Sequence, residues 1–418
     1  MATVVIAPVT FNLAETTRAI EVGRALAARH HRVVVCGYES TYVNLIHDAG
    51  LEYRPLTPAW SARQQAQAMA IDQGRGLRHP FSHDLVDARV QAERALLREV
   101  DADAMVMLTN LTSLISARAE GVPLFYPVPF ALTAPHVAQT RHLGLVPGPS
   151  RVARTLDAAA SGLLRLVYNQ LPLAPRAFTS VARAHGVRPT KTLASLFEAD
   201  WTLYTVLADE LEGYSLPERH VRVGPIFAHL PGEVPPEVRR LADHPRPLLY
   251  LALGSSGNRA LALGAARALG GVDAHVVTPI RHFLEPGDEA SLPPNVTVTD
   301  LLPAHKLGGL VDAAVLHGGQ GTVQTACATG VPFVGMGLQP EQTWNVSVCA
   351  RRGNAIELRP RDVGTPAFTA AVRRVLTDPG IRAAAVRVRD QMAGEDGAAA
   401  TARVVERVVG REGMGGRG

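Results

Sequence analysis

The sequence predicts an α/β protein built from two parallel-sheet domains, and three observations support this fold class. First, 418 residues exceed what a single hydrophobic core usually organises. Second, short apolar runs alternate with segments of helical periodicity in both halves, as in parallel sheets whose strands are joined by helices. Third, a proline-dense stretch at residues 227–247 separates the halves and indicates a semi-rigid connector.

The first half alternates strands and helices from its first residues. The apolar run at residues 3–8 is the first expected strand, since it has neither the basic start nor the long apolar core of a signal peptide. Further strands are expected at residues 32–36, 104–108 and 122–126, and helices at residues 15–29, 41–49 and 113–120.

Two stretches of the first half interrupt this alternation. Residues 127–149 hold five prolines together with His136 and His142, which either face solvent in a loop or contact a substrate. Residues 151–185 carry Leu and Val at helical spacing. This second stretch is either an ordinary packed pair of helices or a lid that lines the binding site of a substrate.

The second half repeats the order of elements. Strands are expected at residues 247–253, 274–278, 296–299, 311–316, 332–336 and 355–358, and a helix ends at Leu269. The chain therefore divides into an N-terminal domain at residues 1–225, a linker at residues 226–245, a C-terminal domain at residues 246–385, and a C-terminal helix with a frayed Gly-rich tail at residues 386–418.

Composition and charge exclude several classes of function. The net charge of +4 is small and no Lys/Arg run interleaves with aromatic residues, so nucleic acid is not an expected partner. No run of about 18 apolar residues exists to span a membrane. The three cysteines lie in apolar contexts that suit buried, reduced thiols. We expect a cytoplasmic protein.

The most informative segment is His317-Gly-Gly-Gln-Gly-Thr322, followed by Gly330-Val-Pro332 and Gln339-Pro-Glu-Gln342. It begins a helix directly after an expected buried strand. A helix N-terminus presents unpaired N–H groups and about half a positive charge, which favours a phosphate, and glycines let that anion approach the backbone. Residues 339–342 emerge at the same carboxyl edge, where open α/β sheets bind ligands. The sequence therefore predicts a nucleoside-diphosphate site beside polar side chains for the group that the diphosphate carries.

These motifs resemble the donor-binding segment of the GT-B nucleotide-sugar glycosyltransferases, in particular the family 1-like bacterial branch that glycosylates antibiotics and other natural products. The likeness is strong over residues 295–360 and fair over residues 247–360. In the N-terminal half it rests on the order of elements alone. It implies two facing Rossmann-like domains with parallel sheets and a central cleft, in which the N-terminal domain holds the acceptor and the C-terminal domain the donor.

The resemblance also implies roles for individual residues. Contacts with the donor diphosphate would come from Ser255, His317, Gly319, Gly321, Thr322 and Asn345. Backbone groups at Leu302 would read the nucleobase, and Gln324 and Thr325 would lie near the ribose. Glu341 and Gln342 would hydrogen-bond hydroxyl groups of the donor sugar. On the acceptor side the expected residues are Asn110, His136 and His142.

Three positions depart from the family pattern. Leu301 stands where an aromatic residue usually stacks on the base, and Thr325 where an acidic residue often holds the ribose. Glu15 replaces the histidine that usually acts as general base at the start of the first helix. The aspartate that orients this histidine would fall near Asn110 or Thr112, so the usual dyad is absent.

Glu15 therefore has two interpretations. A carboxylate in the first turn of a helix is favoured by the helix dipole, so Glu15 could serve the helix alone. Alternatively, Glu15 accepts the proton of the attacking acceptor. That role needs either burial that raises the pKa of the carboxylate or an acceptor that is already acidic.

No metal ion is expected at the site. Asp101-Ala-Asp103 comes before the amino end of a strand, which is the wrong edge for catalysis. His79 and His83 are four residues apart, but Pro80 lies between them and no third ligand is evident. Charge on the leaving diphosphate would instead be stabilised by His317, backbone amides and the helix dipole.

The sequence thus predicts an inverting, metal-independent glycosyltransferase. It would move a hexose or deoxyhexose from a nucleoside-diphosphate donor to a small-molecule acceptor, with no cofactor besides that co-substrate. A nucleotide-sugar epimerase or hydrolase of the same fold, and a non-catalytic protein that activates a partner enzyme, are the alternatives. The choice between uridine and thymidine diphosphate stays open, as does the formation of a homodimer.

Overall fold

The computed structural model describes residues 1–72, 76, 79–146, 148 and 150–415. The chain divides into two compact units, one formed by residues 1–226 together with 396–418 and the other by residues 227–395. Two of the predictions fall partly outside the described residues. These are the Gly-rich end that we expect to fray, at residues 416–418, and the proline-rich stretch, at Pro147 and Pro149.

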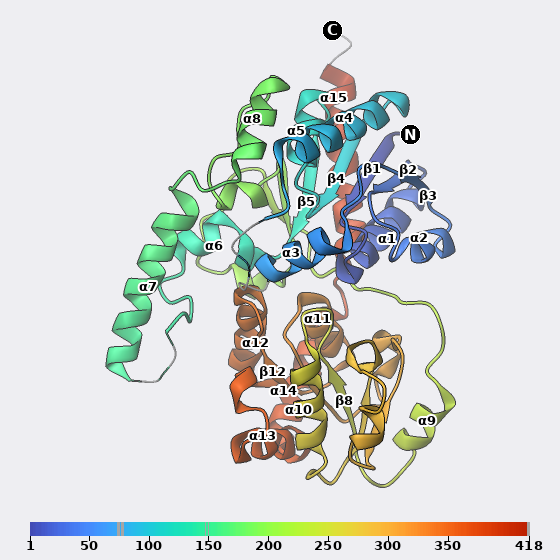
Figure 1. Cartoon of the computed structure of the whole chain (residues 1–418), viewed down its shortest axis with the longest axis vertical. Helices are drawn as coiled ribbons and strands as arrows, with labels where there is room; N and C mark the ends of the chain where they lie inside the picture. The colour runs from blue at the N-terminus through green and yellow to red at the C-terminus, as the bar shows by residue number, and fades with distance from the viewer. Residues whose placement is uncertain (73–75, 77–78, 147, 149, 416–418) are drawn as a thin grey trace. The chain divides into compact units, whose positions relative to one another are not determined.

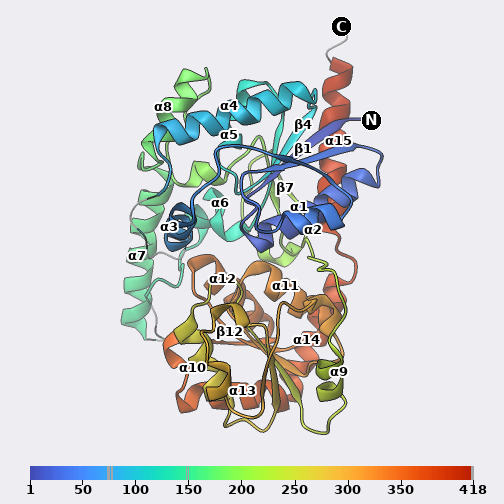
Figure 2. The ribbon, with the colours of Figure 1, turned by 45° about the vertical axis from the view of Figure 1, so that its right-hand side comes forward.

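The first unit is built on a parallel sheet (Figures 1 and 2). Its strands are β1 (Thr3–Pro8), β2 (Arg32–Gly37), β3 (Glu52–Pro55), β4 (Ala104–Leu108), β5 (Leu124–Val128), β6 (Trp201–Tyr204) and β7 (His220–Arg222). They pair in the order β3-β2-β1-β4-β5-β6-β7, so the order of connection reverses between β1 and β4. In an open parallel sheet such a reversal opens a crevice at the carboxyl ends of the strands.

Helices accompany this sheet. They are α1 (Leu13–Ala27), α2 (Val43–Asp48), α3 (Ala62–Asp72), α4 (His83–Glu99), α5 (Ser113–Ala119), α6 (Ala134–Gln139), α7 (Arg151–Asn169), α8 (Arg176–Ala184) and α15 (Gly397–Gly415). α15 comes from the far end of the chain and packs against α1. The backbone N–H of Gly397 donates to the carbonyl of Pro225 over 2.9 Å, where α15 begins.

The second unit repeats the plan on a smaller sheet. Its strands are β8 (Leu248–Ala252), β9 (His275–Thr278), β10 (Val296–Val298), β11 (Ala313–Leu316), β12 (Phe333–Met336) and β13 (Ala355–Leu358), paired as β10-β9-β8-β11-β12-β13. Its helices are α9 (Pro236–Ala242), α10 (Arg259–Leu269), α11 (Gln320–Thr329), α12 (Pro340–Arg352), α13 (Pro366–Thr377) and α14 (Pro379–Met392). The reversal here falls between β8 and β11.

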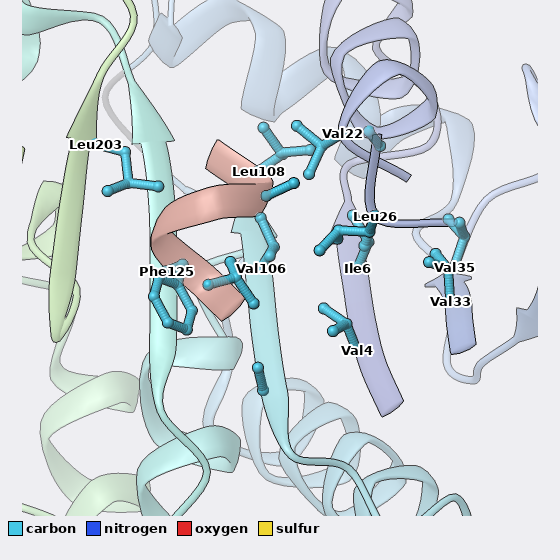
Figure 3. Packing of buried hydrophobic residues seen from close by; sticks show 14 of the residues in the cluster. Val4, Ile6, Val22, Leu26, Val33, Val35, Val106, Leu108, Phe125 and Leu203 are labelled. Carbon is cyan, nitrogen blue, oxygen red and sulfur yellow. The ribbon is translucent and has the colours of Figure 1, made fainter. Parts of the chain in front are cut away.

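The inner strands β4, β8 and β11 are apolar and buried along their whole length because both faces of each sheet are covered, whereas the edge strands β3 and β7 carry charged residues. In β1, Val4 and Ile6 belong to the core that includes α1 and α15, whereas Val5 and Ala7 belong to the core on the opposite face. Figure 3 shows side chains of β1 and β4 packed with Leu26 of α1 in the first of these cores. A strand buried on both faces needs no polar residue at alternate positions, which explains the continuous apolar runs. The predicted α/β class is confirmed.

Several elements differ from the sequence-based expectation. The strand expected at residues 122–126 lies at Leu124–Val128, directly after Pro123. The stretch at residues 127–149, expected as a loop, contains α6, and Pro135 in the first turn is compatible with a helix start. The expected connector at residues 226–245 contains α9, which buries Val238. The region at residues 151–185 forms α7 and α8, which pack on α6 and α4 respectively.

None of the described helices combines the length and the apolar content that crossing a bilayer requires.

The contribution of α15 to the first unit can be measured. Val405 is fully buried in the core that α15 shares with α1. We expect Val405→Ala to lower the free energy of unfolding by about 2 kcal/mol, because it removes two buried methyl groups and leaves a cavity. Urea denaturation checks this, with Arg403→Ala on the exposed face of the same helix as the control. Equal stability of both variants would show that α15 is not part of this core.

Candidate functional site

The carboxyl edge of the second sheet gathers three loops where the strand order reverses. β8 and β12 flank β11, and Leu316 of β11 lies opposite Ala252 of β8 and Gly335 of β12. The loops at residues 253–258, 317–319 and 337–339 therefore emerge side by side. α11 and α12 begin at the ends of the last two loops (Figure 1). Open parallel sheets bind their ligands at such a point.

The imidazole of His317 occupies the centre of this edge. A Cβ atom placed on Gly254 would lie 2.5 Å from Cε1 of His317, and one placed on Gly319 would overlap Nε2. Two glycines from two different loops therefore leave the space that the ring fills. Any larger residue at either position would push the ring out of the site.

His317 is neutral near pH 7. Burial lowers the pKa of this imidazole to about 4, and a hydrogen bond to the carbonyl of Ala252 opposes that effect only in part. Nδ1 of His317 lies 3.4 Å from this carbonyl oxygen. Because a carbonyl can only accept, the proton sits on Nδ1 and Nε2 keeps its lone pair. Nε2 can therefore accept a proton when a negative charge arrives beside it.

The N-terminus of α11 is shaped to receive an anion. Gly319 is its N-cap residue and has no side chain with which to cap the helix. A Cβ atom on Gly321 would meet nothing within 4 Å, so the first turn of the helix is open on that side. Thr322 is half-buried in the same turn. Helix N-termini of this kind bind phosphate through backbone N–H groups and the helix dipole.

Asn345 and Glu341 of α12 hold the loop that follows β11. Nδ2 of Asn345 donates to the carbonyl of Gly318 over 3.0 Å and to Oε1 of Glu341 over 2.5 Å. Gly318 has a φ of 86°, and a Cβ there would lie 2.6 Å from the carbonyl oxygen of Gln342. Glycine is required at this position both by its conformation and by the closeness of α12.

Gln342 links the loops after β8 and β12. Its amide nitrogen donates to Oγ of Ser256 over 2.9 Å and to Oε1 of Gln339 over 2.7 Å. Its amide oxygen accepts from the backbone N–H of Leu338 over 3.0 Å. The side chain is buried. The structure therefore shows Gln342 as a brace between loops, and its contact with a donor sugar stays a prediction.

The remaining residues expected on the donor side differ in how far they are exposed. Ser255 is exposed at the tip of the loop after β8. The side chain of Leu302 is buried while the neighbouring Leu301 is exposed. Gln324 is buried in α11, and Oγ1 of Thr325 donates to the carbonyl of Gly321 within the same helix over 2.8 Å. The hydroxyl of Thr325 thus serves the helix, and its role toward a ribose stays a prediction.

His282 belongs to this edge but was missed in the sequence. It lies in the turn η4 (Arg281–Phe283), after β9. Burial lowers its pKa, while hydrogen bonds to the carbonyls of Pro279 and Gly254 act in the opposite direction. His282 therefore lies against the loop that also bounds His317. The one signal in the sequence was its place four residues after the end of an expected strand.

In the first unit, Glu15 lies near the carboxyl end of β1. The N-cap Asn12 accepts from the backbone N–H of Ala14 over 2.9 Å and begins α1. Oε1 of Glu15 pairs with Arg18 over 2.7 Å, whereas Oε2 is buried and has no hydrogen-bond partner. Asn12 rather than Glu15 caps the start of α1, and Oε2 of Glu15 stays available to accept a hydrogen bond.

Asn110 follows β4, and its side chain hydrogen-bonds to a carboxylate other than that of Glu15. Its Nδ2 donates to Oε1 of Glu93 over 3.0 Å, and Thr112 also donates to this oxygen over 2.5 Å. Tyr38 donates to the same oxygen over 2.7 Å, and Ser116 donates to Oε2. Asn110 and Thr112 thus hold a buried carboxylate on α4 rather than Glu15.

The two histidines of the proline-rich stretch differ from the expectation of solvated loop residues. His136 lies on α6 and is buried, because Phe130 packs edge-on against its ring and Tyr214 stacks on it. Nδ1 of His142 lies 3.2 Å from Oδ2 of Asp157 on α7, with its side chain partly exposed. Because this aromatic packing encloses His136, its ring is less accessible to an acceptor than we expected.

The described part of the chain holds no group of three or more His, Cys, Asp or Glu side chains that could bind a metal ion.

Comparisons with known proteins agree with this geometry. Residues 265–409 match the family described as erythromycin biosynthesis protein CIII-like, C-terminal domain. The crystal structure of the glycosyltransferase VinC in complex with dTDP shares the fold, with a TM-score of 0.68 at 19% identity over 98% of this chain and 100% of that chain. The PGL/p-HBAD biosynthesis glycosyltransferase of Mycobacterium tuberculosis is 28% identical over 80% of this chain and 77% of its own length.

The 4'-demethylrebeccamycin synthase of Lentzea aerocolonigenes is 31% identical over 75% of this chain and 76% of its own length. The chain belongs to the GT-B natural-product glycosyltransferases. The predicted family, fold and class of enzyme are thereby confirmed. The roles of single residues are not settled by this membership and stay predictions.

The contact between Gly319 and His317 of this glycosyltransferase can be tested by a double-mutant cycle. Gly319 has a φ of −57°, which any residue adopts, so the cost of Gly319→Ala comes from the imidazole alone. We expect Gly319→Ala to destabilise the protein, and His317→Ala to relieve about 1–3 kcal/mol of that cost. Chemical denaturation of the four proteins measures this coupling. Gly321→Ala is the control, and additive effects would contradict the proposed packing.

Proposed function

We propose that this glycosyltransferase binds a nucleoside-diphosphate sugar at the N-terminus of α11 and transfers the sugar, with inversion and without a metal ion, to a small natural-product acceptor. The observation that carries the proposal is the neutral His317 held between two glycines beside a helix start with no side-chain cap. A diphosphate is the anion that fits such a helix start, since backbone N–H groups and the dipole favour its charge.

The donor nucleotide is proposed to be thymidine diphosphate, with uridine diphosphate as the comparison. VinC, which shares the fold, was solved in complex with dTDP. Leu301 is exposed beside the buried Leu302, so an apolar surface is available to a base where an aromatic ring is absent. Backbone groups of this segment would then select the base by hydrogen bonds.

The proposed transfer step is a single displacement at the anomeric carbon of the donor sugar. The acceptor hydroxyl attacks the anomeric carbon from the face opposite the diphosphate. The new C–O bond forms as the bond to the diphosphate oxygen breaks, and the hydroxyl proton moves to Oε2 of Glu15. Backbone amides, the α11 dipole and His317 would stabilise the negative charge that develops on the leaving group. This charge stabilisation supports a metal-independent reaction. A cytoplasmic location stays a prediction.

The test is incubation of the protein with thymidine- and uridine-diphosphate sugars, with and without a panel of aromatic and macrocyclic alcohols. Mass spectrometry detects transfer, and NMR of the product gives the anomeric configuration. Retained configuration would overturn the inverting step. Consumption of the donor without any acceptor would indicate a hydrolase or epimerase. Binding of the nucleotide without turnover under every condition would support a non-catalytic partner.

The role of Glu15 predicts a specific loss. Glu15→Gln keeps the shape of the side chain and removes its basicity, so we expect turnover to fall about 100-fold or more with donor affinity changed little. Steady-state kinetics and calorimetry with thymidine diphosphate measure the two effects. Glu21→Gln, which changes another ion-paired carboxylate of α1, is the control. Full activity of Glu15→Gln would leave Glu15 with a structural role only.

The neutral state of His317 predicts proton uptake on binding. A diphosphate close to Nε2 raises the pKa of His317 above its value of about 4 in the free protein. At a pH between the pKa of His317 in the free protein and its higher pKa in the complex, the complex binds more protons than the free protein. The affinity for the diphosphate therefore falls as pH rises through the higher pKa. Calorimetry in buffers of different ionisation enthalpy measures the uptake. Since the phosphate itself titrates near pH 6, His317→Gln is the reference, and equal uptake by both proteins would contradict the contact.

A further inference from the structure

The burial pattern of α7 is the reverse of the one expected for a surface helix. A helix on a protein surface normally buries an apolar stripe and exposes its polar residues. In α7 the buried residues are Asp157 and Ser161, which are 4% and 0% exposed. Oδ1 of Asp157 accepts from the backbone N–H of Val146 over 2.9 Å, and Oγ of Ser161 accepts from that of Leu143 over 3.0 Å. The polar face thus holds the preceding loop.

The opposite face of α7 is apolar and open. Its large side chains keep much of their surface exposed: Val152 69%, Leu156 54%, Leu163 64% and Leu166 45%. Ala159 is exposed between them. We call Val152, Leu156, Ala159, Leu163 and Leu166 the α7 seam. α7 lies at the outer side of α6 in the first unit (Figures 1 and 2).

The spacing of the α7 seam indicates what covers it. Successive members are four, three, four and three residues apart, which is the a/d pattern of helices that pair in coiled coils. The exposed large apolar side chains of α7 are confined to these a and d positions, whereas a helix that packs on a sheet or lies in a membrane carries large apolar residues over a broader face. The partner it fits is therefore another helix with the same periodicity.

The residues that flank the seam allow that helix to be a second copy of α7. The flanking positions hold Ala153, Thr155, Ala160, Gly162, Val167 and Asn169, none of which is charged. Two identical helices with charged flanks would place like charges against each other, and this pair would not. Alanine and glycine also permit close approach of the two backbones.

We propose that two copies of this protein associate through the α7 seam, with the two helices antiparallel about Ala159. An antiparallel arrangement lets the same surface serve both partners around a two-fold axis and opposes the two helix dipoles favourably. The seam spans about two heptads, so the interface is small and the dimer is weak, with a dissociation constant on the order of micromolar. This association does not depend on the proposed donor site.

Sedimentation velocity of the full chain over a range of concentrations tests the proposal. We expect a monomer–dimer equilibrium whose association constant falls at least 10-fold in Leu163→Lys. Because Leu163 is largely exposed, this substitution leaves the fold intact, and circular dichroism checks that. Val386→Lys, which places the same charge at an exposed valine of α14, should leave the equilibrium unchanged. A monomer at all concentrations, or equal dimerisation of Leu163→Lys, would overturn the proposal.

Disulfide trapping tests the antiparallel arrangement. Ala159→Cys places a thiol at the centre of the seam, whereas Thr155→Cys places one at its edge, four residues from the two-fold centre, so that the two thiols of an antiparallel pair lie eight residues apart. The native cysteines are buried and do not interfere. Oxidation should link Ala159→Cys into dimers and leave Thr155→Cys monomeric. Preferential linkage of Thr155→Cys contradicts this register. Binding of a monomeric protein to phosphatidylglycerol vesicles, lost in Leu163→Lys, would assign the seam to a lipid surface instead.

Discussion

The packing of one imidazole between two glycines organises the carboxyl edge of the second sheet. His317 can point into the edge only because Gly254 and Gly319 lack side chains. The same ring reaches the carbonyl of Ala252 on the neighbouring strand, so its position depends on the register of β8 and β11. Asn345 and Gln342 then join the adjoining loops to α12. The ring therefore lies where the register of two strands, two glycine-containing loops and the start of α11 meet.

The first unit uses buried polar groups in place of glycines to shape its edge. Glu93 is almost fully buried and accepts hydrogen bonds from four side chains. Glu39 pairs with Arg89 over 2.9 Å, and the guanidinium lies over the ring of Tyr38 at 3.9 Å. Buried charges persist in proteins when they are paired and hydrogen-bonded in this way. Thr10, in the loop that leads to α1, donates to the carbonyl of Glu39 over 2.7 Å, so this polar cluster adjoins the loop before Glu15.

Local sequence pattern predicted the second unit better than the first. In the second unit the inner strands are short apolar runs, and the glycine motif lies where the strand order reverses, so pattern and site coincide. In the first unit, β6 and β7 follow long helical segments, and no pattern marked them as members of the sheet. The apolar spacing of α7 was visible in the sequence, but the face it exposes was not, because Asp157 and Ser161 are buried by the irregular loop that precedes the helix, and helical periodicity does not describe that loop.

Side-chain roles were predictable only where local chemistry determines them. The helix start at residues 317–322 follows from glycines and a strand, both of which are local. Gln342 and Asn110 were expected to face ligands, yet their amides are occupied by neighbouring side chains. Which partner an amide selects depends on residues brought together by the fold, such as Ser256 and Glu93, and no spacing along the chain encodes that choice.

The origin of α15 has a consequence for how the protein is made. Residues 227–395 form a continuous stretch, so the second unit can fold as soon as it leaves the ribosome. The first unit is translated earlier, yet its core against α1 lacks Ala402 and Val405 until the last residues are synthesised. During synthesis, an apolar face of α1 therefore remains uncovered while the second unit is completed. The core of the first unit is therefore completed only after the second unit has been translated.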